Sequence, residues 1–484
     1  MNFFEEVRNS IVGINHTLTT SYGEKPLIYL DWIASGRLYH PLEEKMLHTF
    51  GPMVANTHTE SNSTGAFMTN AYHEALQLLK IHVNADSNDV IITEGSGCTG
   101  VINKFQRILG LKVPEKFKSY INLDEDHKPV VFVTHMEHHS NHTSWLETIA
   151  DVVVVEPNEL GEVEPNHLKA LLETYKSRPL KIGSFTACSN VTGIMTPYHE
   201  LAKIMHEYDG FCFVDFAASA PYVEINMHPA DPMEKLDAIF FSPHKFLGGP
   251  GSCGVLIFDS TLYKNTVPDH AGGGTVLWTN PWGEKKYFDD IETREDGGTP
   301  NFLQTIRAAL CIKLKDIMME NNMMERKDSL FSYLWHHLSS IKEVNILGHK
   351  SKNAKRLGMI SFYIDNIPYN LLVKLLDEKY GIQVRGGCSC AGTYGHYLLN
   401  IDQSTSKHIT DELSQGNLTS KPGWIRVSIH PTNTFEELET FITAIREIIH
   451  HYDQWKNDFI YDSVTGEYEH KSKVDQSSYN LFEW

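Results

Sequence analysis

The sequence lacks three features that would assign the protein to particular classes. No uninterrupted apolar stretch approaches the length of a membrane-spanning helix. Basic residues are outnumbered, 42 against 61 acidic ones, and the formal net charge of −19 disfavours nonspecific binding to nucleic acid. The seven cysteines, an odd number, form no disulfide framework, and most of them stand in apolar runs. We therefore expect a soluble protein that binds neither nucleic acid nor a membrane.

The start of the chain and the state of the cysteines favour one cellular compartment. Residues Met1 to Glu6 lack the basic and apolar regions of a secretory signal. Unpaired cysteines fit a reducing environment, so we expect a cytoplasmic protein. The chain also shows no internal repeats or low-complexity tracts.

The order of apolar patterns predicts an α/β protein with two domains. Strand-like and helix-like runs alternate over residues 26–310, which predicts a large domain with a doubly wound, mostly parallel sheet. Residues 311–451 predict a smaller C-terminal α/β domain, joined by one long helix from Ile306 to Leu338. We expect residues 1–25 to form an amphipathic helical segment that packs with the small domain, and residues 452–484 to form a polar tail.

One lysine stands at a turn suited to covalent catalysis. Lys245 follows a short apolar run and precedes a glycine-rich turn that leads into a second such run. Two buried strands would hold this turn, and burial lowers the pKa of a lysine amine until it can form a Schiff base with a carbonyl compound. Ser242 and His244 supply a hydroxyl and an imidazole beside it. The competing interpretation is a solvated loop lysine, which three further segments disfavour.

The first of these segments is a glycine-rich turn between a predicted strand and a predicted helix. Free backbone amides at Gly97, Cys98 and Thr99, together with the helix dipole, would favour a phosphate group. Such turns can also serve only to reverse the chain. Neither a Walker sequence nor a complete dinucleotide fingerprint is present, which disfavours a nucleotide as the ligand.

The other two segments each end an apolar run with polar side chains. Asp215 lies where parallel sheets bind ligands, and a carboxylate there would keep a pyridine nitrogen protonated, although it would equally cap a following helix. His138, His139 and His142 lack a zinc-binding spacing, so we expect no metal site. An imidazole stacked on an aromatic cofactor is the better interpretation, and His138 is the predicted residue.

In their shared order along the chain, these motifs resemble a known family. The chain is similar to the class V aminotransferase superfamily of fold type I enzymes, and within it to the cysteine desulfurases and selenocysteine lyases. These enzymes use pyridoxal 5′-phosphate. The resemblance runs from Tyr29 to Glu437, which is most of the chain. It implies the fold type I architecture, with a large cofactor domain and a smaller C-terminal domain.

The resemblance implies a role in cofactor binding for each motif residue. In the Ser-x-His-Lys motif, Lys245 would hold pyridoxal phosphate covalently, and Ser242 and His244 would help to bind its phosphate. Asp215 would face the pyridine nitrogen. His138 would stack on the ring and take part in catalysis.

The resemblance also implies the substrate site and a homodimer. Asn190 would approach the ring oxygen and the substrate, and Arg426 would pair with the α-carboxylate of an amino-acid substrate. Thr275 ends a Gly-Gly-Gly-Thr segment that resembles the loop lent to the phosphate by a partner subunit. Cys390 lies where the desulfurases carry their nucleophilic cysteine.

Three departures from the family pattern limit what the resemblance transfers. Ala218 stands where the family commonly has a glutamine that contacts the ring oxygen, so Asn190 or different cofactor electronics must compensate. Residues 393–423 form a longer connection than usual, suited to a lid or a docking loop. Cys388 adds a second cysteine to a loop that normally has one.

The sequence predicts an enzyme that removes sulfur or selenium from a cysteine-like amino acid to give alanine. Cys390 would become a persulfide, and a sulfur-acceptor protein would be a partner. An aminotransferase, a C–S β-lyase or an amino-acid epimerase would share Lys245, Asp215 and Arg426, and Cys390 would then be structural. The alternative outside enzymes is a scaffold or regulatory protein that keeps the fold, although a scaffold has no physical need for these residues.

Overall fold

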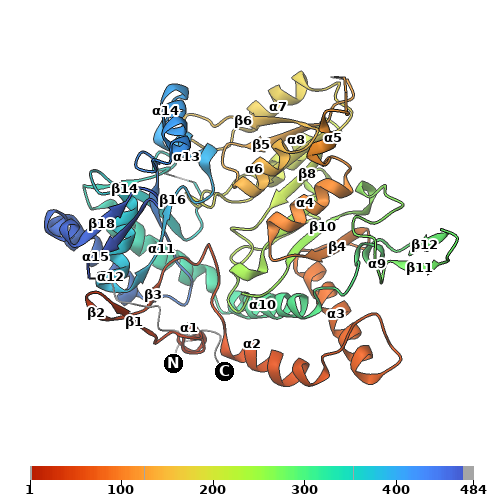
Figure 1. Cartoon of the computed structure of the whole chain (residues 1–484), viewed down its shortest axis with the longest axis horizontal. Helices are drawn as coiled ribbons and strands as arrows, with labels where there is room; N and C mark the ends of the chain where they lie inside the picture. The colour runs from red at the N-terminus through yellow and green to blue at the C-terminus, as the bar shows by residue number, and fades with distance from the viewer. Residues whose placement is uncertain (1–2, 125, 353, 473–484) are drawn as a thin grey trace.

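A computed structural model describes residues 3–124, 126–352 and 354–472, and its larger part is built on a seven-stranded sheet (Figure 1). The strand order is β4-β10-β9-β8-β7-β5-β6. The strands are β4 (Asp89–Glu94), β5 (Val130–Thr134), β6 (Asp151–Val155), β7 (Lys181–Thr186), β8 (Phe211–Asp215), β9 (Ala238–Phe241) and β10 (Gly254–Asp259). Neighbouring strands pair in parallel except β10, which is antiparallel to both β4 and β9. The predicted α/β fold with a mostly parallel sheet is confirmed.

Helices cover both faces of this sheet, which explains why its strands are almost continuous apolar runs. On one face, Phe105 and Trp145, from α4 (Cys98–Ile108) and α6 (His139–Leu146), share a cluster with alternate strand residues such as Phe213. On the other face, Leu168 and Leu201 pack from α7 (Pro165–Thr174) and α8 (Tyr198–Glu207). Each strand therefore buries side chains on both of its sides.

A second, smaller sheet contains β13 (Val344–Ile346), β14 (Met359–Ile364), β17 (Trp424–Ser428) and β16 (Arg385–Gly387), in that order and antiparallel throughout. Its apolar face packs against α11 (Met323–Ser339), α12 (Tyr369–Tyr380) and α15 (Phe435–Trp455) in a separate cluster. Figure 1 shows this unit beside the large sheet, with α10 (Phe302–Glu320) running beneath the large sheet.

The remaining elements are short apart from α3, which packs on α10. They include β3 (Ile28–Tyr29), α2 (His40–Lys45), α3 (Ser63–His82), α5 (Glu115–Lys118), β11 (Val276–Thr279), β12 (Lys285–Tyr287), α9 (Ile291–Glu295) and β15 (Ile382–Gln383). None of the helices in the described residues combines the length and the apolar character that a membrane crossing requires.

The predicted helical segment over residues 1–25 is wrong in its extent. The helix α1 spans only Phe3–Asn9, and β1 (Thr17–Thr20) and β2 (Gly23–Pro26) follow as a hairpin. Gly13 and Gly23 adopt φ values of 75° and 89°, a left-handed conformation that interrupts a helix. The segment does contact the smaller unit, because Arg8 bonds to Glu437 of α15.

The single long helix expected from Ile306 to Leu338 is also wrong, because two helices occupy this region. Asn322 separates α10 from α11 with a φ of 61°, the left-handed conformation that asparagine tolerates better than most residues. The apolar spacing continues through this break, so the pattern alone does not reveal it.

The long connection predicted over residues 393–423 and the polar tail predicted over residues 452–484 both contain regular structure. Residues 393–423 include most of α13 (Gly392–Leu399) and all of α14 (Gln403–Ser414). In the predicted tail, β18 (Phe459–Asp462) and β19 (Glu467–His470) form a hairpin, and the amide of Asn370 on α12 donates to the carbonyl of Gly466. The rest of the predicted tail, residues 473–484, lies outside the described residues.

Glu437 is predicted to be a stability determinant that joins the N-terminal helix to α15. It accepts from Arg8 at 2.6 Å and from the Thr434 amide at 3.1 Å, where it completes a capping box. Glu437→Ala should lower the free energy of unfolding by about 1–2 kcal/mol. Exposed Glu436 is the matched control, and Glu436→Ala should change stability much less. Denaturant unfolding of both variants measures the difference, and equal effects would contradict this role.

Candidate active site

A cavity of about 270 Å³ lies at the carboxyl ends of the parallel strands, where this class of sheet binds ligands. The predicted residues that line it are Gly97, Cys98, Thr99, His138, Asn190, Asp215, Ser242, His244, Lys245 and Arg426. They come from turns after β4, β5, β7, β8 and β9 and from β17 of the smaller sheet. Two predicted residues, Thr275 and Cys390, do not line this cavity.

One wall of the cavity is a cradle of backbone amides and small side chains. The Cys98 amide, at the start of α4, donates to the Ser242 hydroxyl at 2.9 Å. The His244 ring nitrogen Nδ1 lies 2.8 Å from the Ser96 carbonyl and donates to it. A Cβ at Gly97 would lie 2.9 Å from the His244 ring, so any larger residue would crowd the cradle. The arrangement suits an anion, because the dipole of α4 favours negative charge at the start of the helix.

Two buried groups of opposite charge face this cradle. Burial lowers the pKa of the Lys245 amine, and the nearby Cys98 and Asp215 oppose that shift. Burial likewise raises the pKa of Asp215, while the Ala217 amide and then Lys245 lower it. Asp215 accepts from the Ala217 amide at 2.8 Å, in a turn that leads into no regular helix. The helix-cap interpretation of Asp215 is therefore wrong, and its carboxylate faces the cavity.

His138 lies on the same cavity with a neutral ring. It caps α6, and its Nδ1 accepts from the Ser140 amide at 3.1 Å. Burial, followed by the positive charge of Lys245, lowers the pKa of His138 to about 3. The other two histidines point elsewhere, because His139 Nε2 accepts from the Gly392 amide and His142 contacts Thr393. The three rings therefore form no common ligand set.

An arginine pair marks the side of the cavity that faces the smaller sheet. Arg426 donates to the Asp31 carboxylate at 2.9 Å and to the Asn190 carbonyl at 2.9 Å. Arg385 reaches the other oxygen of Asp31 at 3.3 Å and also lines the cavity. Sequence reasoning missed Asp31, which lies 395 positions from Arg426 and carries no local signal.

The cysteine turn lies next to this arginine pair. The Ala391 amide donates to the Cys388 carbonyl at 3.0 Å, and Ser389 and Cys390 adopt φ values of 52° and 56°. When the two central residues of a hydrogen-bonded four-residue turn are both left-handed, the turn is of type I′. Glycine and asparagine are the usual residues at these two positions. Burial lowers the pKa of Arg426, and the negative charge of Asp31 raises it.

The seven cysteines differ in their access to solvent. Cys390 is exposed and Cys388 is half-buried, whereas Cys98, Cys188, Cys212, Cys253 and Cys311 are buried. Cys390 is therefore the exposed thiol next to Ser389, which lines the cavity, whereas Cys98 and Cys188 line the cavity as buried thiols.

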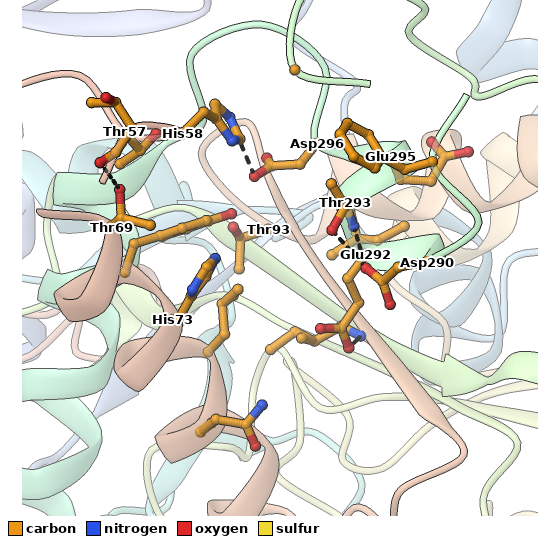
Figure 2. A pocket seen from close by; sticks show the side chains of 18 of the residues that line it. Thr57, His58, Thr69, His73, Thr93, Asp290, Glu292, Thr293, Glu295 and Asp296 are labelled. Carbon is orange, nitrogen blue, oxygen red and sulfur yellow. Dashed lines mark hydrogen bonds and ion pairs between the residues drawn. The ribbon is translucent and has the colours of Figure 1, made fainter. Parts of the chain in front are cut away.

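Thr275 lies beside a different and larger cavity of about 790 Å³, shown in Figure 2. Gly274 and Val276 line that cavity, and Thr275 donates from its hydroxyl to the Gly272 carbonyl at 2.7 Å. Figure 2 shows His58 directed toward Asp296, with their nearest atoms 3.9 Å apart. Within one chain, the glycine loop thus stays away from Lys245.

The comparison with known families identifies the class to which this fold and site belong. The family model for class V aminotransferases matches residues 28–441, so the chain belongs to the class V aminotransferase family.

Individual relatives share this architecture over most of the chain. A cysteine desulfurase of Synechococcus elongatus is 26% identical over 428 residues, which cover 88% of this chain and 61% of that protein. A probable cysteine desulfurase of Synechocystis sp. is 25% identical, with 88% of this chain and 91% of the relative covered. The apo structure of a cysteine desulfurase from Thermococcus onnurineus NA1 superposes with a TM-score of 0.73 at 22% identity, covering 93% of this chain and 99% of that one.

The buried environment of His138 predicts that its ring stays uncharged between pH 8 and 5, because its pKa is lowered to about 3. An unfolded histidine binds a proton below about pH 6.5, so the folded state loses stability as pH falls from about 6.5 toward 3. NMR of histidine-labelled protein, with His138→Gln for assignment, should show no titration of His138 in the range from pH 8 to 5. Exposed His127, whose pKa is raised by Asp124, is the titrating control. A His138 midpoint near 6.5 would overturn this assignment.

Proposed function

We propose that the protein is a pyridoxal-phosphate enzyme that removes sulfur, or selenium, from a cysteine-like amino acid to give alanine. One observation carries the proposal: Lys245, Asp215, His138 and Arg426 converge on one cavity, with an exposed thiol at its edge. The names of the relatives agree with it. A scaffold protein would need none of these buried polar and charged groups, each of which costs free energy of desolvation.

The residues of the cavity fit pyridoxal phosphate. Its phosphate would lie at the start of α4, where Gly97 leaves space and Ser242, His244 and Thr99 supply polar groups. Asp215 would face the pyridine nitrogen and His138 would stack on the ring, which its neutral state permits. Pyridoxal phosphate, when bound, supplies an electron-withdrawing ring that stabilises negative charge developing on the substrate carbons.

Lys245 would hold the cofactor and then move protons. The lowered pKa of its amine increases the fraction that is neutral and nucleophilic, as bond formation with an aldehyde requires. Once the substrate amine has displaced it, the same amine is free to take the proton from the substrate Cα. Arg426 and Asn190 would meanwhile orient the substrate, with the guanidinium on the α-carboxylate.

Cys390 would carry out the sulfur transfer. Its thiolate attacks the substrate sulfur, a sulfur–sulfur bond forms as the carbon–sulfur bond breaks, and the carbon takes up a proton. Cysteine and the enzyme thiol thus become alanine and an enzyme persulfide, with no external oxidant. The exposure of Cys390 supports delivery of this sulfur to an acceptor protein.

The same cavity supports other reactions of amino acids, and one experiment separates them. The purified holoenzyme should convert L-cysteine or L-selenocysteine into alanine and load sulfur or selenium on the protein. A keto acid that retains the sulfur or selenium would instead indicate an aminotransferase, pyruvate with free sulfide or selenide a C–S β-lyase, and D-amino acid an epimerase. The absence of a visible cofactor absorbance band after reconstitution would favour the scaffold alternative.

Cys390→Ala is expected to abolish persulfide formation and most alanine production from cysteine, because Cys390 is the exposed cysteine among the seven and follows Ser389, which lines the cavity. Its cofactor spectrum should stay intact, since Cys390 does not line the cofactor cavity. Cys388→Ala is the matched control and should retain substantial activity. Full alanine production by Cys390→Ala would contradict the persulfide mechanism.

A homodimer with a shared site is the second part of the proposal. The loop from Gly272 to Thr275 stays away from Lys245 of its own chain, which supports its donation to a partner's phosphate site. We expect inactive Lys245→Ala chains and inactive Gly274→Val chains to complement each other when mixed. Valine is strained at the φ of 85° that Gly274 adopts.

Random exchange should restore up to about one quarter of the wild-type activity, because half of the dimers are mixed and each holds one intact site. Activity is measured before and after the two chains are unfolded and refolded together. Differently tagged chains copurify if subunits have exchanged. Copurification without any activity would mean that each site is built within one chain.

A further inference from the structure

Three buried polar atoms of residues that line the cavity have no hydrogen-bond partner within the part of the chain that the structure describes. They are Arg426 Nε, Asn190 Oδ1 and Ser389 Oγ. The residues that carry them are 3%, 7% and 8% exposed, and all three line the cavity that contains Lys245. Leaving a buried polar group unpaired costs roughly 1–3 kcal/mol, so three such atoms together point to a ligand that satisfies them.

The three residues form one connected unit. Arg426 NH1 donates to the Asn190 backbone carbonyl at 2.9 Å, and the Asn190 side-chain amide donates to the Ser389 carbonyl at 2.7 Å. This last bond fixes the orientation of the Asn190 side chain, because a carbonyl can only accept. The free atom of Asn190 is therefore an acceptor, that of Arg426 is a donor, and the Ser389 hydroxyl can act as either.

The backbone conformation of Ser389 is energetically unfavourable for a residue other than glycine. Ser389 is not glycine, yet it adopts a φ of 52° as the first left-handed residue of the type I′ turn. Such conformations persist where the surrounding structure enforces them, and they cluster at ligand-binding sites. Here the Asn190 amide and the bond from Ala391 to Cys388 hold the turn. The result is a hydroxyl that shares the cavity with Arg426 and has no hydrogen-bond partner among the described residues.

We propose that Ser389 is a substrate-binding residue whose hydroxyl donates a hydrogen bond to the α-carboxylate that Arg426 holds. The three free atoms then complement an α-amino acid, since two donors meet its carboxylate and the Asn190 oxygen accepts from its amine. Ser389 precedes Cys390 in the same turn. A carboxylate that binds to the Ser389 hydroxyl therefore also fixes the turn that carries the Cys390 thiol. This inference deepens the proposed function, but it requires only that the substrate is an α-amino acid.

The test uses the holoenzyme and two probes that differ by one carboxylate. L-Alanine carries an α-carboxylate, and ethylamine is the same amine without it. Binding of each is followed by the change in visible cofactor absorbance, for wild type, Ser389→Gly and Ser389→Ala. Glycine removes the hydroxyl while accepting the left-handed backbone, whereas alanine removes the hydroxyl and keeps the strain. Ser252→Ala is the matched control, because Ser252 is also a buried serine with an unpartnered hydroxyl but does not line the cavity.

Both Ser389 variants should raise the dissociation constant for L-alanine about 10-fold or more, the usual scale for a hydrogen bond to a charged group. Ethylamine binding and the cofactor spectrum should stay unchanged, and Ser252→Ala should match wild type with both probes. With L-cysteine as substrate, KM should rise more than kcat falls.

Three results would overturn the proposal. The first is unchanged L-alanine binding in both variants, and the second is an equal loss for both probes, which would indicate a structural effect. The third is a loss in Ser389→Ala alone, which would assign the effect to backbone strain. If wild type makes no alanine from cysteine, the desulfurase proposal fails, whereas the comparison of the two probes still decides the role of Ser389.

Discussion

The ion pair between Asp31 and Arg426 is the interaction on which the geometry of the site depends. The Arg426 side chain is 3% exposed and donates to Asp31 at 2.9 Å, so loss of the carboxylate would leave a buried charge without its partner. Breaking such a pair typically costs about 3–5 kcal/mol. Asp31 also bonds to Arg385, at the start of the strand that precedes the cysteine turn. One carboxylate therefore positions both arginines of the cavity.

The segment around Asp31 connects the two sheets through this pair. Ile28 and Tyr29 pair with β15, and Asp31 bridges to Ser428 of the smaller sheet. A few residues later the Gly36 amide donates to the His244 carbonyl at 2.9 Å, next to Lys245. A Cβ at Gly36 would lie 1.8 Å from the Phe246 carbonyl oxygen, so only glycine permits this approach. The segment from Ile28 to Gly36 therefore contacts both the turn that carries Lys245 and the part of the cavity that contains Arg426, and it fixes their relative position.

Local sequence predicted the parts of the site that depend on local structure. Strands covered on both faces are apolar runs, and the polar residue that ends each run marks the ligand edge, which is how Asp215, His138 and Lys245 could be found. Asp31 and Ser389 could not be found this way. Asp31 matters because of residues 354 and 395 positions away, and Ser389 matters because Asn190 fixes its turn from 199 positions away.

The two incorrect helix predictions have one cause. Each depends on a left-handed backbone conformation that the spacing of apolar residues does not reveal. The helix expected over residues 1–25 ends at Asn9, before the left-handed Gly13, and the helix expected from Ile306 to Leu338 divides at the left-handed Asn322. In both places the apolar spacing alone favoured a continuous helix. A single residue with positive φ reverses the chain without altering that spacing, so only tertiary structure reveals the break.

The cavity contains buried cations although the protein as a whole has a formal net charge of −19. Their electrostatic environment indicates what the cavity can bind. Burial lowers the pKa of Lys245 and of Arg426, so both cations are destabilised by loss of water. Asp31 is shared between two arginines, which leaves the cavity short of negative charge. Surface carboxylates contribute little at this depth, because salt screens exposed charges beyond about 8–10 Å. A bound anion would stabilise both buried cations, because charges interact strongly where the dielectric constant is low. The acidic residues on the surface do not replace such an anion.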